Sequence, residues 1–372
     1  MDVKPALVSA ATSCRLPTKF WGASTATPRQ NTAIGLRLPG KQSCFALLLA
    51  KLVRRRTSCR AATAAATADE ISGMSDLITR GYDGILLDQY GVLHDGREVL
   101  PGVQDCLDQL HQRGIPMAIV SNSPCESPNA LLRLESLGLA TDYFTNVVTS
   151  GDQAKRYLEA LISEAAPVRL RCVFISHADH AERGTWSPEQ LRSMGMELVS
   201  SIEECDFILA NGVQVCYKGT LSEIESNYES DASDWGVFGK VLETAAKGQR
   251  PLIISNPDCV VHRKNGVLAN CPGQFAKKYS ASGGKHLYVF GKPGKEIFRE
   301  ASRALEVCGA RRICHVGDSL IHDVGGAAGA GFDSVLVCGG IHAPELQGMS
   351  VSDLCRRKGA PCPTFTMSTF HW

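Results

Sequence analysis

Short apolar runs, each bounded by polar or glycine-rich residues, recur along this 372-residue chain between residues 84 and 340. Helix-like segments, such as 102–113, 126–137, 152–164 and 294–307, lie between them. The runs are continuously apolar rather than alternating, which is typical of parallel strands buried on both faces. Consecutive strand–helix units require right-handed crossovers, so the pattern predicts an α/β fold with a doubly wound parallel sheet. The predicted strands lie within residues 84–88, 116–122, 146–151, 171–176, 206–212, 251–256, 287–293, 313–318 and 334–340.

Four polar residues end these apolar runs or follow them within two residues: Asp88, Ser121, Lys292 and Asp318. Because the carboxyl ends of the strands form the ligand crevice of an open parallel sheet, these residues are expected to meet there. Each one alone has an ordinary explanation. An aspartate or serine after a strand often caps a helix or shapes a turn, and an isolated lysine is usually a solvated surface residue. The ordered set of four indicates a site.

This order resembles the haloacid dehalogenase-like (HAD) hydrolase superfamily, and most closely its subfamily IIA. The likeness covers residues 80–342, and the ending PTFTMSTFHW (363–372) looks like that of a poorly characterised branch. It implies a doubly wound, Rossmannoid core with an α/β cap domain inserted between the second and third motifs. The segments that carry the resemblance are DQYGVLHDG (88–96), IVSNSP (119–124), VVTSGDQAKRYL (147–158), ISNPD (254–258), FGKPGKEIF (290–298) and VGDSLIHDVGGAAGAG (316–331).

The resemblance implies that Asp88 is a nucleophile, which attacks phosphorus and forms an aspartyl-phosphate that water later hydrolyses. Ser121 and backbone N–H groups near Asn122 would donate hydrogen bonds to the phosphate. Lys292 would neutralise charge on both Asp88 and the phosphoryl group.

The resemblance also implies a Mg²⁺ site, because a carboxylate that approaches a phosphate dianion needs a cation to cancel the repulsion. Asp88, Asp318 and the backbone carbonyl of Tyr90 would supply oxygen ligands. Asp323, five residues after Asp318, would either contact the metal through a water or hold Lys292.

Tyr90 departs from the family pattern, which usually has a second aspartate two residues after the nucleophile. That aspartate protonates the leaving oxygen and then activates water, a contribution typically of about 10²–10⁴-fold in rate. A phenol, with a pKa near 10, donates a proton but is a poor base at neutral pH. His94 or Asp95, just downstream, would either replace the missing group or merely shape the turn.

The resemblance divides the chain into a first core part (75–167), a cap (168–255), a second core part (256–345) and a C-terminal tail (346–372). Asn256 and Asp258, at the return to the core, are expected near the substrate mouth. A cap of this kind closes over small molecules and excludes large ones, so a small phosphorylated metabolite is the expected partner. The cap is also the expected surface for a homodimer.

The first 60 residues contain 11 Lys and Arg residues and one acid, which leaves a net charge of −9 on the rest of the chain. This composition, rich in Ser, Thr and Ala, predicts a disordered transit peptide over residues 1–65. A chloroplast address is favoured over a mitochondrial one, and an extension without an address is the alternative. The apolar run 44–50 is too short to span a bilayer. Neither membrane nor nucleic acid is therefore an expected partner.

Together these features favour a Mg²⁺-dependent phosphatase. Tyr90 leaves open an alternative, a catalytically weak or inactive regulatory protein that binds phosphate or a metabolite in the same pocket. An active enzyme is expected to prefer substrates with good leaving groups, such as aryl or acyl phosphates, which need no protonation.

Overall fold

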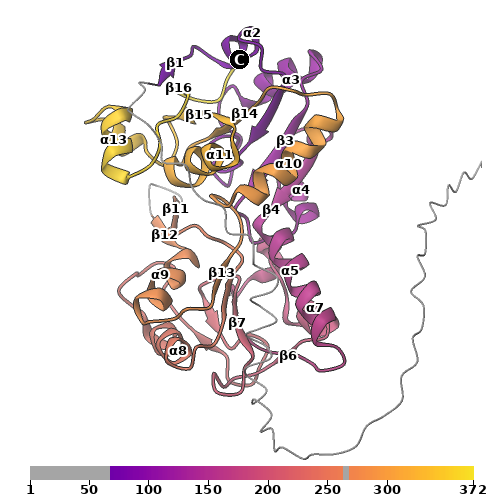
Figure 1. The fold of residues 1–372 in the computed structure, drawn as a ribbon, viewed down its shortest axis with the longest axis vertical. Coiled ribbons are helices and arrows are strands. Elements are labelled where there is room, and N and C mark those ends of the chain that lie inside the picture. Colours follow the sequence, from indigo (N-terminus) through magenta and orange to yellow (C-terminus); the bar gives the residue numbers. More distant parts are fainter. Residues whose placement is uncertain (1–67, 263–267) are drawn as a thin grey trace, which may run out of the picture. The chain divides into compact units, whose positions relative to one another are not determined.

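Figure 1 shows the fold in a computed structural model, which describes residues 68–262 and 268–372. The predicted transit peptide lies outside these residues, and its role stays a prediction. The described chain forms two parallel sheets and two short antiparallel hairpins. None of its helices within these ranges combines the length and the apolar character needed to cross a bilayer.

The first sheet consists of parallel strands with helices on both faces. Successive residues of one strand face opposite layers, because Ile85 and Leu87 pack with one set of helices and Leu86 packs with the other. This is the doubly wound α/β core that the sequence predicts. Its seven strands follow the order β1 (Asp69–Glu70), β16 (Phe365–Met367), β15 (Asp333–Val337), β14 (Ile313–Gly317), β2 (Gly84–Leu87), β3 (Met117–Ser121) and β4 (Phe144–Thr149). One face packs on α2 (Met74–Thr79), α3 (Val103–Gln112) and α4 (Ser127–Ser136), and the other on α10 (Lys295–Val307) and α11 (Gly325–Ala330).

The second sheet is also parallel and also covered on both faces. Its five strands follow the order β13 (Leu287–Val289), β10 (Leu252–Ile254), β7 (Phe207–Ala210), β5 (Arg171–Ile175) and β6 (Glu197–Leu198). One face packs on α8 (Gly236–Lys247) and α9 (Gly273–Ala281), and the other on α5 (Ser150–Ala165) and α7 (Pro188–Ser193). Helix α5 begins with a capping box, in which Thr149 Oγ1 accepts from Asp152 N at 3.0 Å and the Asp152 carboxylate accepts from Thr149 N at 3.1 Å.

Three predicted boundaries differ from the structure. Helix α5, assigned to the first core part, buries Ala154, Leu158 and Leu161 against the second sheet. The second sheet also continues beyond residue 255, because β13 pairs with β10. Finally, β16 lies within the predicted C-terminal tail but is a strand of the first sheet. An apolar run does not indicate which sheet it joins, which is why these three elements could not be assigned from the sequence.

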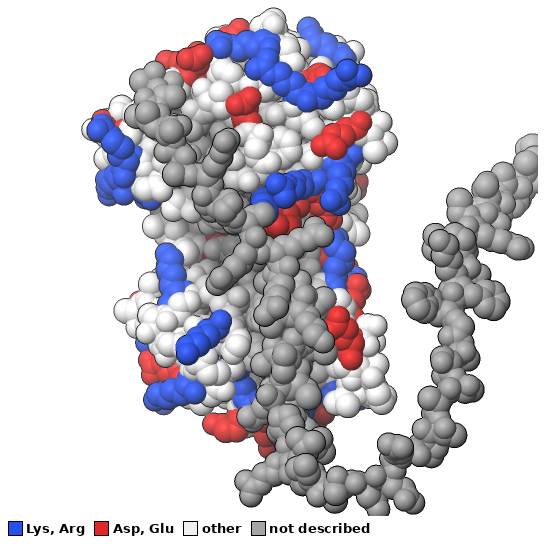
Figure 2. All heavy atoms as spheres, in the orientation of Figure 1, with Lys and Arg blue, Asp and Glu red and all other residues white. Residues whose placement is uncertain are grey.

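The remaining elements are short. On the first-sheet side they are η1 (Thr141–Tyr143), η3 (Leu320–Val324), α12 (Ala343–Leu346) and α13 (Val351–Lys358). On the second-sheet side they are α6 (His180–Arg183) and the hairpins β8 (Val215–Cys216) to β9 (Ile224–Glu225) and β11 (Val260–His262) to β12 (Leu268–Asn270). On the face viewed in Figure 2, acidic side chains lie among the basic ones.

The C-terminal residues are part of the first core. Phe370 is 1% exposed and packs in the same apolar cluster as β2, while the carbonyl of His371 accepts from Met74 N at 2.8 Å. We expect Phe370→Ala to lower the free energy of unfolding by about 3–5 kcal/mol, because the substitution opens a cavity in a packed core. Val307→Ala, at an apolar position that is 88% exposed, is the matched control. Urea denaturation measures both, and equal midpoints for the two variants would contradict the structural role of the tail.

Candidate active site

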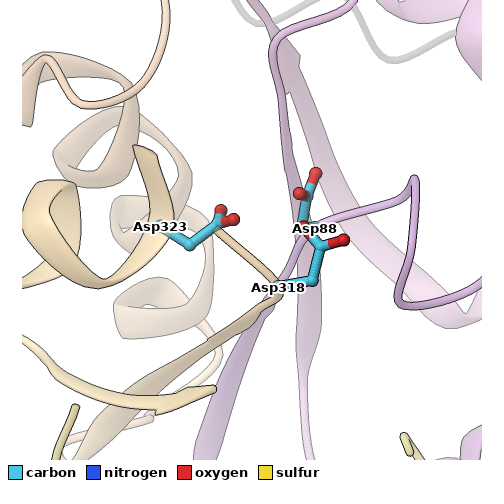
Figure 3. Close-up of side chains that lie close together, drawn as sticks. All are labelled: Asp88, Asp318 and Asp323. Atoms are coloured by element: carbon cyan, nitrogen blue, oxygen red, sulfur yellow. The ribbon is translucent and has the colours of Figure 1, made fainter. Parts of the chain in front are cut away.

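Two carboxylates come from neighbouring strands of the first sheet. Asp88 directly follows β2 and Asp318 directly follows β14, and these strands pair with Leu87 beside Val316. Parallel pairing therefore brings both side chains to the carboxyl edge of the sheet. Asp323 comes from η3, the short helical segment that follows β14. Figure 3 shows the three side chains together, and one carboxylate oxygen of each lies within 4.8 Å of the others.

The turn after Asp88 is so tight that residue 91 has to be glycine. Gly91 has a φ of 81°, in the left-handed region, and a Cβ on it would lie only 1.9 Å from Asp318 Oδ2. The loop that carries Tyr90 thus packs directly against Asp318. This is where a backbone carbonyl ligand from residue 90 would have to lie.

Lys292 reaches two of the three carboxylates from the second sheet, because it follows β13 by three residues. Its side chain is 2% exposed, and Nζ lies 2.7 Å from Asp88 Oδ1 and 2.7 Å from Asp323 Oδ1. Burial alone would lower the pKa of Lys292, but the charges of Asp323 and Asp88 outweigh it and hold this pKa above its ordinary value. The lysine is therefore a permanent cation between the two carboxylates.

The three carboxyl groups differ in their electrostatic environment. Burial, reinforced by the charge of Asp323, raises the pKa of Asp88 to about 7. Burial and the charge of Asp88 likewise raise the pKa of Asp318 well above its ordinary value. Although burial opposes it, Lys292 and then His315 lower the pKa of Asp323. Asp323 is thus the ionised partner of Lys292. The positive charge of this one lysine does not balance the negative charges that surround Asp88 and Asp318.

This donor set fits a Mg²⁺ ion. Asp88 and Asp318 supply hard oxygen donors at a buried sheet edge, which is the ligand chemistry that Mg²⁺ prefers. A divalent cation would also stabilise the ionised form of these crowded carboxylates, whose pKa values are raised in its absence. Asp323 is already bound through both oxygens, since Oδ1 contacts Lys292 and His315 and Oδ2 accepts from Ser319 N at 2.9 Å. Of the two predicted roles for Asp323, the geometry favours holding Lys292.

The crowding predicts a pH dependence of stability in the metal-free protein. A carboxyl whose folded pKa exceeds its unfolded value of about 3.9 stabilises the fold fully below that value, and this stabilisation is lost as the pH rises through the folded pKa. The pKa of about 7 for Asp88 therefore predicts that the free energy of unfolding falls as the pH rises from about 4 to about 7. The slope should approach about 1.4 kcal/mol per pH unit. Urea unfolding in EDTA measures it, and Asp88→Asn should flatten the curve; an unchanged slope in this variant would show that other groups cause the dependence.

Ser121 and Asn122 lie at the end of the strand next to β2. Ser121 ends β3, which pairs with β2, so its side chain lies at the same sheet edge as Asp88. Its Oγ accepts from Ser123 N at 3.2 Å, which shapes the loop that follows. Asn122 Oδ1 accepts from Lys292 N at 2.7 Å. The Asn122 side chain thus holds the backbone of Lys292. This role was not predicted, since only a contact between phosphate and backbone N–H groups near Asn122 was expected.

Asn256 and Asp258 belong to the loop after β10, and Asp258 connects this loop to the first sheet. Asp258 Oδ1 accepts from Asn122 Nδ2 at 2.8 Å and lies 2.9 Å from His322 Nδ1. Asn256 Oδ1 accepts from Asp258 N at 2.9 Å and so shapes the turn. His322 was missed in the sequence, although its place directly before Asp323 was a usable signal. Burial alone would lower the pKa of His322, but the pairing with Asp258 raises it.

The flap after the nucleophile holds Tyr90, His94 and Asp95. The Tyr90 ring meets the His94 ring edge-on at 5.7 Å between centroids. His94 is 3% exposed, and its Nδ1 accepts from Gly96 N at 2.9 Å. Burial, with a smaller effect of Arg133, lowers the pKa of His94 to about 4. Asp95 accepts from two backbone N–H groups of its own turn, at 2.9 and 3.0 Å, which is the turn-forming alternative.

Comparisons with known proteins agree with this fold. Residues 85–182 match the family model of haloacid dehalogenase-like hydrolases, and residues 289–353 match a second model described as HAD-hydrolase-like. Both matched segments are thus those of HAD-like hydrolases, and the seven-stranded sheet described above has the Rossmannoid core fold of this class.

Individual relatives are distant in sequence. The chain is 21% identical over 266 residues to an acid sugar phosphatase of Staphylococcus aureus, across 71% of this chain and 89% of the relative. A HAD-like hydrolase structure from Brucella suis superposes with a TM-score of 0.61 at 24% identity, over 81% of this chain and 99% of that one. A glycerol phosphate phosphatase of Mycobacterium tuberculosis, solved in complex with magnesium, gives a TM-score of 0.51 at 21% identity, over 78% and 75% of the two chains. These structures share the fold with this chain.

Proposed function

We propose that this chain is a Mg²⁺-dependent phosphatase that hydrolyses small phosphorylated metabolites through an aspartyl-phosphate on Asp88. One observation supports this more than any other: the buried Lys292 Nζ lies 2.7 Å from both Asp88 and Asp323. The names of two relatives, an acid sugar phosphatase and a glycerol phosphate phosphatase, favour small phosphate esters as the substrate class.

In the first step, an oxygen of Asp88 attacks phosphorus, the new O–P bond forms and the ester O–P bond breaks. Asp88 Oδ1 accepts hydrogen bonds from Gln89 N and Lys292 Nζ, both at 2.7 Å, so Oδ2 is the oxygen for the attack. Lys292 cancels part of the repulsion between the carboxylate and the phosphate. Ser121, at the same sheet edge, would donate to a phosphate oxygen. A Mg²⁺ ion held by Asp88, Asp318 and the carbonyl of residue 90 would supply further neutralisation of charge.

In the second step, water cleaves the acyl phosphate and releases Asp88 and inorganic phosphate. A base at position 90 would normally remove the proton of this water. Tyr90 is a weak base, and the buried His94, with its Nδ1 engaged by Gly96, is fixed within the flap. We therefore propose that the chain retains nucleophile, cation and metal ligands, and works with little acid–base help from the flap.

The test compares leaving groups. With the mature chain and Mg²⁺, turnover of aryl and acyl phosphates should exceed that of alkyl phosphates, because the better leaving groups depart without a proton. Tyr90→Asp should raise turnover of alkyl phosphates about tenfold or more, within the range that acid–base catalysis supplies, and should change aryl turnover little. Tyr90→Phe is the matched control. Equal rates on alkyl and aryl esters would refute the leaving-group preference, and Mg²⁺-dependent phosphate binding without turnover of any ester would favour the regulatory alternative.

A further inference from the structure

A histidine lies inside the apolar strand β14, where neither the sheet nor the core requires a polar side chain. His315 is fully buried, and its Nε2 lies 2.8 Å from Asp323 Oδ1. The Phe298 ring meets its ring edge-on, with 4.9 Å between centroids. Within the part of the chain that the structure describes, His315 Nδ1 has no hydrogen-bond partner. A buried polar atom without a partner destabilises the fold. A histidine at this position is therefore expected to serve a purpose through its other ring nitrogen, Nε2.

The contact belongs to a chain of short interactions that ends at the nucleophile. Asp323 Oδ1, the atom that contacts His315 Nε2, also lies 2.7 Å from Lys292 Nζ. The same Nζ lies 2.7 Å from Asp88 Oδ1. All of these side chains are buried, so these interactions act in a medium of low polarity, where hydrogen bonds to charged groups are strong.

The geometry also indicates the tautomer. A ring nitrogen that faces a carboxylate oxygen at 2.8 Å carries the proton, because two lone pairs at this distance would repel each other. The proton is therefore on Nε2, and the unpartnered Nδ1 is the bare nitrogen. In this state His315 donates to Asp323 without adding charge to the site.

We propose that His315 is a positioning residue of this site, whose Nε2–H fixes the Asp323 carboxylate and thereby holds Lys292 against Asp88. The role in catalysis rests on the proposed phosphatase function. Without the imidazole, Asp323 Oδ1 keeps the lysine but loses the donor that fixes its orientation, so Lys292 is less well placed for the phosphoryl group. Hydrogen-bond partners that orient the ligands of metal sites typically contribute about 10–100-fold to activity, and we expect an effect of this order here.

Two amide substitutions separate the hydrogen bond from the volume. The amide nitrogen of Gln reaches the place of imidazole Nε2, whereas that of Asn reaches only the place of Nδ1. We expect His315→Asn and His315→Phe to lower kcat about 10–100-fold with KM changed less than threefold. His315→Gln should stay within about threefold of the wild type by keeping the donor. If Asn and Gln lower kcat equally, or kcat follows the melting temperature through the series, the role is structural and the proposal is wrong.

A second measurement is independent of turnover and uses the unmodified full chain. Nitrogen-15 NMR of the histidine-labelled, metal-free protein should show His315 as the neutral Nε2–H tautomer, with a signal that shifts in Asp323→Asn. A bare Nε2 would overturn the proposal even if the enzyme is active. An Nε2–H tautomer in a protein without phosphatase activity would leave the hydrogen bond in place and count against the proposed function instead.

Discussion

Asp88→Asn is expected to abolish Mg²⁺-dependent phosphatase activity, with a loss of about 10⁴-fold or more, since the amide is a far weaker nucleophile than the carboxylate. The fold should remain intact. Asp88 is buried beside Asp318 and Asp323, so removal of its charge relieves repulsion among three carboxylates. Steady-state kinetics with an aryl phosphate, together with urea unfolding, would measure both effects.

The matched control for this variant is Asp142→Asn, which makes the same chemical change at an exposed position in η1. It should leave kcat and stability unchanged. A covalent test adds to the kinetics, because wild-type protein quenched during turnover should carry an acid-stable, hydroxylamine-sensitive phosphate that Asp88→Asn lacks. Turnover retained by the purified Asp88→Asn variant would exclude the aspartyl-phosphate mechanism.

Lys292→Met should have the second large effect, on stability as well as on activity. The substitution leaves Asp88 and Asp323 buried without their cation, and loss of one partner of a buried ion pair costs about 3–5 kcal/mol. Catalysis should fall by about 10²–10³-fold, because the cation that stabilises the transferring phosphoryl group is absent. Lys285→Met, at an exposed lysine just before β13, is the control and should change neither property.

The double variant Lys292→Met with Asp88→Asn tests whether this cost is electrostatic. The second substitution removes one of the uncompensated charges, so it should recover part of the lost stability, with a coupling of about 1–3 kcal/mol. Urea denaturation of the four proteins in EDTA completes the cycle. Strictly additive losses would mean that the Lys292–Asp88 pair carries none of this cost, which would then lie with Asp323 or with packing.

The sequence predicted the class of the fold because continuous apolar runs and helical segments alternate in a way that few architectures satisfy. It could not assign each strand to its sheet. The runs at 252–254 and 287–289 have the same apolar character as those at 85–87 and 313–317, and only tertiary pairing separates them. The residues at 365–367 are followed by a tail-like sequence, yet they form β16.

For the site, the order of Asp88, Ser121 and Asp318 predicted a common location, because parallel strands of one sheet bring their carboxyl ends to one edge. Lys292 was expected at the same edge, but it follows β13 of the second sheet and reaches the site from there. The contacts of His315 and His322 were not predictable from their spacing. Each histidine contacts an aspartate from a turn or a distant loop, and such pairings depend on side-chain direction. The single polar residue within the run ICHVG was nevertheless a signal, since buried strands rarely contain an imidazole without a reason.

The position of Lys292 in the chain has a consequence for how the protein folds. Asp88 and Asp318 belong to one sheet, whereas their cation arrives on the segment that leaves the other sheet. The charge balance of the site therefore requires both sheets. A folding intermediate with only the first sheet in place would bury the carboxylates of Asp88 and Asp318 without the positive charge of Lys292. Formation of the site and docking of the two sheets should thus occur as a single cooperative event. Phosphate binding would then report complete assembly of the chain rather than the folding of either half.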